Sequence, residues 1–183
     1  MLRRVMLIPL FLICVTGCQT ISVESNKDSA YRKPLSRVLI YLSIKKSAYD
    51  PSIVAKQLSE KLAEHGVLTQ TIIKKETESE DMQAVLSNAA SIYSPNQILT
   101  ILTKEDNSFR AFGLGGGANV YSVERHVIFL DVTVFDVVTS KNIWRAFVYG
   151  MSKPLENSLV DTIMRKLDVD GLLPAPITTN KTP

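Results

Sequence analysis

The chain has 183 residues, of which 45% are hydrophobic and 21% charged, and its formal net charge is +3. This is the size of a single domain, with enough apolar sequence for a packed core. Lysine and arginine form no continuous block, so the composition gives no support for nucleic-acid binding. Both cysteines, Cys14 and Cys18, lie near the start, which leaves no cysteine-ligated zinc site in the later sequence.

The first residues have the pattern of a secretory signal. Arg3 and Arg4 precede an unbroken apolar run from Val5 to Val15. As a helix this run would be about 16 Å long, roughly half the thickness of the hydrocarbon core of a bilayer. A buried first helix is the alternative, but the run lacks the amphipathic spacing of a surface helix. The pattern therefore predicts a leader over 1–17 rather than a membrane span.

The end of the apolar run resembles the lipobox of bacterial lipoproteins. The motif is Val15-Thr16-Gly17-Cys18, in which Thr16 departs slightly from the commonest pattern. The resemblance implies that the leader is removed and that Cys18 is the lipid attachment residue. Two or three acyl chains hold a protein to a membrane far more firmly than one chain. Because Gln19 rather than Asp follows the cysteine, the resemblance also implies an outer-membrane location, on the periplasmic face.

Polar or proline-rich sequence flanks the predicted domain. Residues 18–36 lack a clear hydrophobic pattern and contain Pro34, so we expect a flexible tether after the lipidated cysteine. Residues 174–183 contain three prolines and are expected to form an irregular tail. Between them, 37–173 is predicted to fold as a single domain.

The first half of this domain alternates strand and helix patterns. Apolar runs predict strands at 37–44, 67–75 and 97–103. A helix is predicted between the first two strands, with Asp50 as N-cap, Pro51 in the first turn and Gly66 at the end. A second helix is predicted before Pro95, with a capping box at Thr77 and Glu80.

The second half of the domain changes to a hairpin pattern. β-branched and aromatic residues predict a strand at 127–138, a polar turn at 139–142 and a partner strand at 143–150. A last helix is predicted near 158–167. The fold class is therefore α+β or α/β, with a single mixed sheet, the order β-α-β-α-β-β-β-α and an antiparallel hairpin edge.

The hairpin carries a second resemblance. Asp136, Thr139 and Trp144 occupy a strand end, a polar turn and the partner strand. Together with the element order, this resembles periplasmic accessory lipoproteins: outer-membrane activators of peptidoglycan synthases and the N-terminal domain of the Tol-system propeller protein. Ser140-Lys141-Asn142 stands where those proteins usually have a glycine. The resemblance implies a protein-binding module without an active site.

One glycine-rich loop is a candidate contact site. It contains Phe112, Gly113, Leu114, Gly115, Gly116 and Gly117. A phosphate-binding loop would lead into a helix and often carries a lysine, whereas this loop lacks the lysine and leads into a strand. A flexible hairpin loop is therefore the simpler interpretation, and a partner-contact loop is the alternative.

Few residues suggest catalysis. His126 and Glu124 are two apart and share a strand face, so they form a conceivable acid–base pair, although a cross-strand polar contact is the simpler interpretation. Asp131 and Asp136 are five apart and fall on opposite faces. Trp144 is expected in the core or on the sheet surface rather than stacked on a ligand, and no serine-hydrolase or zinc-protease motif is present.

These observations favour a non-enzymatic lipoprotein. We expect an outer-membrane anchor through acyl chains on Cys18, an envelope protein as partner, and no cofactor, metal or nucleic acid. The alternative is a small-ligand carrier or envelope enzyme with a site near His126.

Overall fold

The structure, a computed structural model, describes residues 21–45, 49–74, 81–114, 120–151 and 156–176, with the backbone alone described at 105–114, 120–126, 151 and 156. The elements in chain order are β1 (Ile21–Lys27), β2 (Arg37–Ser43), α1 (Pro51–Glu64), β3 (Leu68–Ile73), α2 (Met82–Tyr93), β4 (Gln97–Leu114), β5 (Val120–Asp136), β6 (Lys141–Met151) and α3 (Glu156–Val169).

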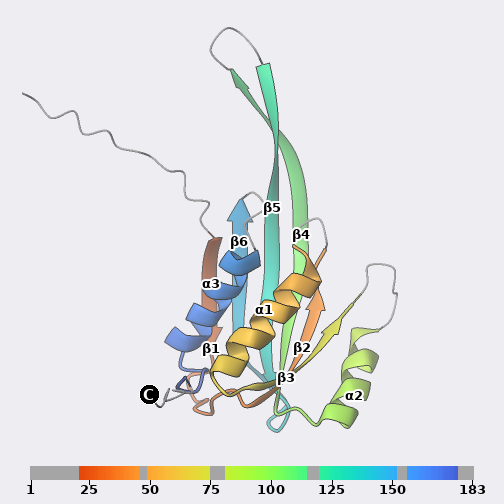
Figure 1. Cartoon of the computed structure of the whole chain (residues 1–183), viewed down its shortest axis with the longest axis vertical. Helices are drawn as coiled ribbons and strands as arrows, with labels where there is room; N and C mark the ends of the chain where they lie inside the picture. The colour runs from red at the N-terminus through yellow and green to blue at the C-terminus, as the bar shows by residue number, and fades with distance from the viewer. Residues whose placement is uncertain (1–20, 46–48, 75–80, 115–119, 152–155, 177–183) are drawn as a thin grey trace, which may run out of the picture.

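The strands form one mixed sheet in the order β1-β6-β5-β4-β2-β3 (Figure 1). β2 is parallel to both β3 and β4, whereas the pairs β4–β5, β5–β6 and β6–β1 are antiparallel. The predicted α+β class, with a single mixed sheet and an antiparallel hairpin, is confirmed.

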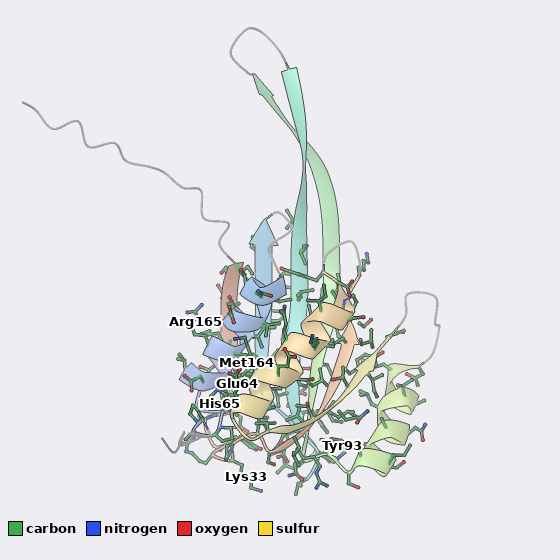
Figure 2. The ribbon with its side chains drawn as sticks, in the orientation of Figure 1. Lys33, Glu64, His65, Tyr93, Met164 and Arg165 are labelled. Atoms are coloured by element: carbon green, nitrogen blue, oxygen red, sulfur yellow. The ribbon has the colours of Figure 1, made fainter. Side chains whose placement is uncertain are left out.

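The first helix follows its sequence signals closely. The Asp50 carboxylate accepts a hydrogen bond from the Ser52 amide at 2.9 Å, and Pro51 opens the helix. After the helix, Gly66 takes a positive φ of 74°, a backbone conformation that glycine adopts without strain. His65, labelled in Figure 2, is the C-cap residue. Its Nδ1 lies 2.7 Å from the carbonyl oxygen of Pro174.

The main core lies between the sheet and the pair α1 and α3. These two helices pack side by side, and Lys61 of α1 forms an ion pair with Asp161 of α3 at 2.9 Å. Both bury apolar stripes at helical spacing against the strands. The buried residues of the two helices are Val54, Ala55, Leu58, Leu62, Leu159, Val160, Ile163, Met164 and Leu167.

The second helix lies on the opposite face of the sheet. Arg37 alternates with the buried core residue Val38, so it lies on the face away from α1, and its guanidinium is 6.0 Å from the ring centroid of Tyr93 in α2. Leu39 and Tyr41 share that face and are fully buried, although they do not belong to the main core.

The start of α2 differs from the prediction. Asp81, not a Thr77–Glu80 capping box, is the N-cap, and its carboxylate accepts from the Gln83 amide at 3.0 Å. Thr77 and Glu80 lie outside the described residues. All twelve residues of α2 are described and none is fully buried; Ile92 is 80% exposed.

The segment expected to be a tether contains a strand. Ile21–Lys27 pairs with β6 over its whole length, so β1, not the β5–β6 hairpin, forms this edge of the sheet. Its alternating residues Ile21 and Val23 pack against the core. Asp170, just after α3, accepts hydrogen bonds from Ser25 Oγ at 2.7 Å and Trp144 Nε1 at 2.6 Å, which ties β1 to the domain.

Residues 28–36, the rest of the expected tether, lie at the end of the sheet where β5 terminates. Tyr31 is buried there, and its hydroxyl donates to Asp136 at 2.9 Å. Burial raises the pKa of Asp136, but hydrogen bonds from Thr139 and Tyr31 outweigh burial and hold the pKa below its ordinary value. Ser140 has a φ of 54° in this turn, which is a left-handed conformation that residues other than glycine rarely adopt.

Removing β1 should weaken the domain. A protein that begins at Ala30 loses the β1–β6 pairing and the half-buried Ile21 and Val23, which together should lower the free energy of unfolding by about 2–4 kcal/mol relative to a protein that begins at Gln19. Urea denaturation followed by circular dichroism measures the difference. Equal unfolding midpoints would show that residues 19–29 are a dispensable tether.

Candidate functional site on the open face of the sheet

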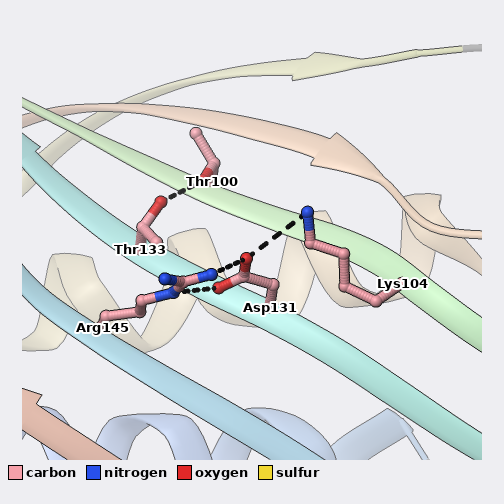
Figure 3. A network of polar contacts seen from close by, with 5 residues as sticks. All are labelled: Thr100, Lys104, Asp131, Thr133 and Arg145. Carbon is pink, nitrogen blue, oxygen red and sulfur yellow. Dashed lines mark hydrogen bonds and ion pairs between the residues drawn. The ribbon is translucent and has the colours of Figure 1, made fainter.

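The face of β4, β5 and β6 opposite α1 and α3 carries an exposed group of aromatic and charged residues. We call this surface the open face; in Figure 3 the helices lie behind the strands. Its members alternate with the core residues of the same strands, so each strand sends one set inward and the other outward. They are Thr100, Leu102, Lys104, Phe129, Asp131, Thr133, Arg145, Phe147 and Tyr149.

Aromatic rings form one part of the open face. Phe129 of β5 and Phe147 of β6 stack with ring centroids 5.5 Å apart and an interplanar angle of 19°. Tyr149 lies directly across from Phe129 in the register and is 43% exposed, while Phe147 is 36% exposed. The guanidinium of Arg145 lies 4.6 Å from the Phe147 ring centroid, within the range of a cation–π contact.

A carboxylate holds two cations at the centre of the open face. Arg145 donates from Nε to Asp131 Oδ1 at 2.9 Å and from Nη2 to Oδ2 at 2.7 Å, which is a bidentate pair (Figure 3). Lys104 Nζ lies 3.6 Å from the same Oδ2. Both cationic side chains remain about half exposed, whereas the Asp131 side chain is only 6% exposed.

The position of Lys104 depends on an irregularity in β4. The register shifts between Thr103 and Glu105, so Lys104 is an extra residue with no partner position in β5. Such a bulge redirects a side chain, and here the extra residue contacts Asp131 on the open face. Thr100 and Thr133, whose hydroxyls are 2.5 Å apart, form a neighbouring cross-strand pair.

The Asp131 carboxylate is strongly stabilised in its charged form. Hydrogen bonding from Arg145 lowers the pKa of Asp131 below its ordinary 3.8, and the charges of Arg145 and Lys104 act in the same direction. Burial by itself would raise this pKa, but its effect is smaller than the combined effect of the two cations. The bidentate geometry therefore keeps both side chains in fixed places, which makes the open face a preformed surface.

A shallow groove borders the open face. Its volume is about 600 Å³, and it runs along β1 and β6. Four of its lining residues belong to the same face of the sheet: Glu24, Asn26, Arg145 and Phe147. Within the described residues, no three or more histidine, cysteine or acidic residues are grouped so that they could hold a metal ion.

The glycine-rich loop lies at the end of a long two-stranded arm. Phe112, Gly113 and Leu114 are the last residues of β4, and Leu114 pairs with Val120 of β5. Gly115, Gly116 and Gly117 lie outside the described residues, as does Cys18. The proposed contact role of this loop and the lipid attachment at Cys18 therefore stay predictions.

The predicted acid–base pair also lies in the arm. In the register His126 is opposite Ser108, and Glu124 is opposite Arg110. The groove beside the open face is lined by other residues. The alternative of a site at His126 stays a prediction, with no described cavity that favours it.

Sequence reasoning placed some site residues correctly and missed others. Trp144 is buried in the core as predicted, and Asp131 and Asp136 do lie on opposite faces of β5. The cluster of Asp131, Arg145 and Lys104 was missed. Strict alternation along 127–136 could have indicated Asp131 as an outward residue, but its partners come from strands whose register the sequence does not specify.

Comparison with known proteins identifies no family. No protein-family model and no curated protein matches the chain. Solved structures with a similar arrangement include PelC from Paraburkholderia phytofirmans, described as a dodecamer, with 14% identity, a TM-score of 0.49 and coverage of 85% of this chain and 99% of that chain. A minor lipoprotein from Acinetobacter baumannii has 14% identity, a TM-score of 0.34 and coverage of 76% and 96%.

A third solved structure, a PDZ domain protein from Parabacteroides distasonis, has 7% identity, a TM-score of 0.39 and coverage of 82% of this chain and 36% of that chain. At these identities and TM-scores, the likenesses assign neither an activity nor an assembly to this chain. Within the described residues, none of the helices is long and apolar enough to cross a membrane.

Acid should weaken the domain partly through Asp131. Because its pKa is lower in the folded state, it contributes stability above about pH 4, and this contribution is lost as the pH falls through the folded-state pKa. Asp131→Asn should therefore flatten the fall in unfolding free energy between about pH 5 and about pH 2. The measurement is a series of urea midpoints across that range.

Asp168→Asn is the matched control, since it removes the same charge from an exposed position on α3. An Asp131→Asn profile as steep as that of the control and the unaltered protein would show that the Arg145 pair does not contribute to acid sensitivity.

Proposed function

We propose that this chain is a lipid-anchored protein of the bacterial cell envelope whose periplasmic domain binds another envelope protein through the open face. The role is non-enzymatic and needs no cofactor, metal or nucleic acid. The lipobox resemblance at Val15–Cys18 supports the anchor, and Gln19 supports an outer-membrane location. The observation that carries the binding role is the open face itself.

The chemistry of the open face suits a protein partner. Tyrosine, phenylalanine and arginine are enriched where proteins meet, and here they lie together on the open face. The stacked Phe129 and Phe147 offer an apolar centre, with Tyr149 beside them. An aromatic surface of this kind contributes to binding when a partner excludes water from it.

Charge defines the partner more closely. At the centre of the open face two cations share one carboxylate, so Lys104 and Arg145 together exceed Asp131 by one positive charge. Glu24 is exposed on the margin at β1. The expected partner presents an apolar group to the aromatic residues and a carboxylate within reach of Lys104.

The anchor is tested at its attachment residue. Cys18→Ser should abolish labelling by radioactive palmitate and move the protein from the membrane fraction to the soluble fraction, or leave the leader uncleaved. Gln19→Ser is the matched control and should keep the label. Palmitate labelling that persists in Cys18→Ser would contradict lipid attachment at this residue.

The open face is tested by photo-crosslinking in the native cell. A benzophenone amino acid at Tyr149 should give a discrete adduct with an envelope protein, whereas the same probe at Val138, 74% exposed in the β5–β6 turn, should not. Lys104→Glu should reduce the adduct at position 149 because it repels the partner's carboxylate. Lys56→Glu, on the outer side of α1, is the matched charge reversal and should leave the adduct unchanged.

The binding role fails under either of two results. One is the absence of an adduct at position 149 while the protein is folded and membrane-bound. The other is an adduct of equal yield at positions 149 and 138, which would indicate random collision.

A further inference from the structure

The longest strands of the sheet extend well beyond their neighbours. β2 ends at Ser43, opposite Leu102 of β4, and β6 ends at Met151, opposite Val127 of β5. β4 and β5 continue together as far as the pair Leu114–Val120. Among the described strands, none pairs with this extension, which Figure 1 shows as a ribbon projecting from the body. We call residues 108–114 and 120–126 the arm.

An isolated two-stranded ribbon is marginally stable in water, because it has no second layer to cover either face. The arm is also long. Leu114 is eight positions beyond Asp106 in β4. At about 3.4 Å per residue, the arm therefore reaches about 27 Å beyond the row of Asp106. A binding surface that covers the arm would therefore stabilise it.

The outer part of the arm carries no charge. From Ala111 to Val123 the sequence contains no aspartate, glutamate, lysine, arginine or histidine. Charged residues begin again where the uncharged part ends. In the strand register, Arg110 is opposite Glu124, and Arg125 is opposite Phe109. The arrangement is an uncharged end rich in apolar and aromatic residues, with two arginines at its base. The apolar and aromatic residues of the outer part are Phe112, Leu114, Val120, Tyr121 and Val123.

This pattern matches a lipid surface better than a protein groove. Tyrosine and other aromatic residues favour the interface between headgroups and acyl chains, and arginines bind lipid phosphates.

The first residue of β1 and the base of the arm lie at the same end of the sheet. Ile21 pairs with Gly150, Gly150 pairs with Ile128, and Ile128 pairs with Asp106, so these residues form one row across four strands. Because β1 is antiparallel to β6, its first residue lies in this row, where the arm begins (Figure 1). Cys18 is three residues before Ile21, so its Cα lies at most about 11 Å from that of Ile21.

These two lengths give the position of the membrane relative to the arm. The arm reaches about 27 Å beyond the shared row, and Cys18 lies at most about 11 Å from this row. With the acyl chains of Cys18 in the bilayer, an upright arm would place its end at least about 16 Å deeper than Cys18. A membrane at the anchor therefore meets the arm.

We propose that the end of the arm inserts into the headgroup region of the membrane that holds the acyl chains of Cys18. The inference rests on the proposed lipid attachment, which fixes the side from which the membrane approaches. The outer edges of the ribbon have unpaired backbone N–H and C=O groups, and hydrocarbon cannot satisfy them. The end of the arm therefore stays in the interface, and the domain tilts so that the arm meets the membrane obliquely.

Insertion gives the domain a second point of attachment. A lipid on a short linker restricts the distance between the domain and the membrane, but it leaves the domain free to rotate. The arm removes this freedom and holds the open face at a defined angle to the membrane.

A fluorescent residue at the end of the arm tests the inference. In protein beginning at Gln19, with Trp144→Phe as background, Phe112→Trp should show a blue shift and quenching by brominated acyl chains on vesicles of phosphatidylethanolamine and phosphatidylglycerol. Val138→Trp, in the turn at the other end of β5, is the matched control and should show neither. The same probes are then measured in lipidated protein in vesicles.

A second variant tests the role of the apolar residues. Leu114→Ser together with Val120→Ser should weaken vesicle binding of the unlipidated protein at least about tenfold, because a large apolar side chain that leaves water contributes more than a factor of ten. Ile92→Ser, on exposed α2, is the matched control and should have no effect.

The inference is overturned if Trp at position 112 is unquenched in both the unlipidated and the lipidated protein, or if positions 112 and 138 are quenched alike. A crosslinker at position 112 that captures a protein in cells, with no vesicle response, would assign the arm to a protein partner instead. Because the vesicle experiment with unlipidated protein does not involve Cys18, its outcome is independent of palmitate labelling. Failure of the anchor and failure of the arm are thus distinguishable.

Discussion

The handedness of two crossover connections determines which surfaces this sheet exposes. β2 lies between β3 and β4, so the chain moves outward through α1 and then back across β2 through α2. Both connections join parallel strands and are expected to be right-handed, so the two helices must lie on opposite faces. α3 returns to the side of α1 and completes the core there. Among the described helices, only α2 remains for the other side. It lies near β2, so no described helix covers the face of β4, β5 and β6.

An open sheet face needs polar anchors if it is to keep one conformation. Asp131 supplies one, because a nearly buried carboxylate is stable only when it is paired, and the bidentate contact with Arg145 pairs it. Arg145 in turn lies over Phe147, which stacks on Phe129. The charged and aromatic parts of the open face are therefore one connected arrangement. A substitution of Asp131 would therefore alter the aromatic surface as well as the ion pair.

Unequal strand lengths connect the open face to the proposed membrane contact. β4 and β5 share a ladder that continues past the ends of β2 and β6, and a bulge at Lys104 lies just below the point where the arm begins. Bulges increase local twist, so the same residue that contacts Asp131 also affects the direction of the arm. β1 places the expected lipid at this end of the sheet. In the proposed arrangement, the acyl chains set the distance from the membrane, the arm sets the angle, and the open face is free for a partner.

The sequence by itself determined most of the local elements, because these depend on neighbouring residues. The expected leader and the lipobox resemblance are local in the same sense, and they stay predictions. Asp50, Pro51 and Gly66 bounded α1, and apolar spacing identified the core faces of α1 and α3. Only the tertiary structure decided that Ile21–Lys27 is an edge strand, since a half-polar segment becomes a strand when a distant partner supplies the hydrogen bonds. It also decided that Lys104 and Arg145 converge on Asp131. That convergence depends on strand order, register and one bulge, and alternation along a single strand contains none of these.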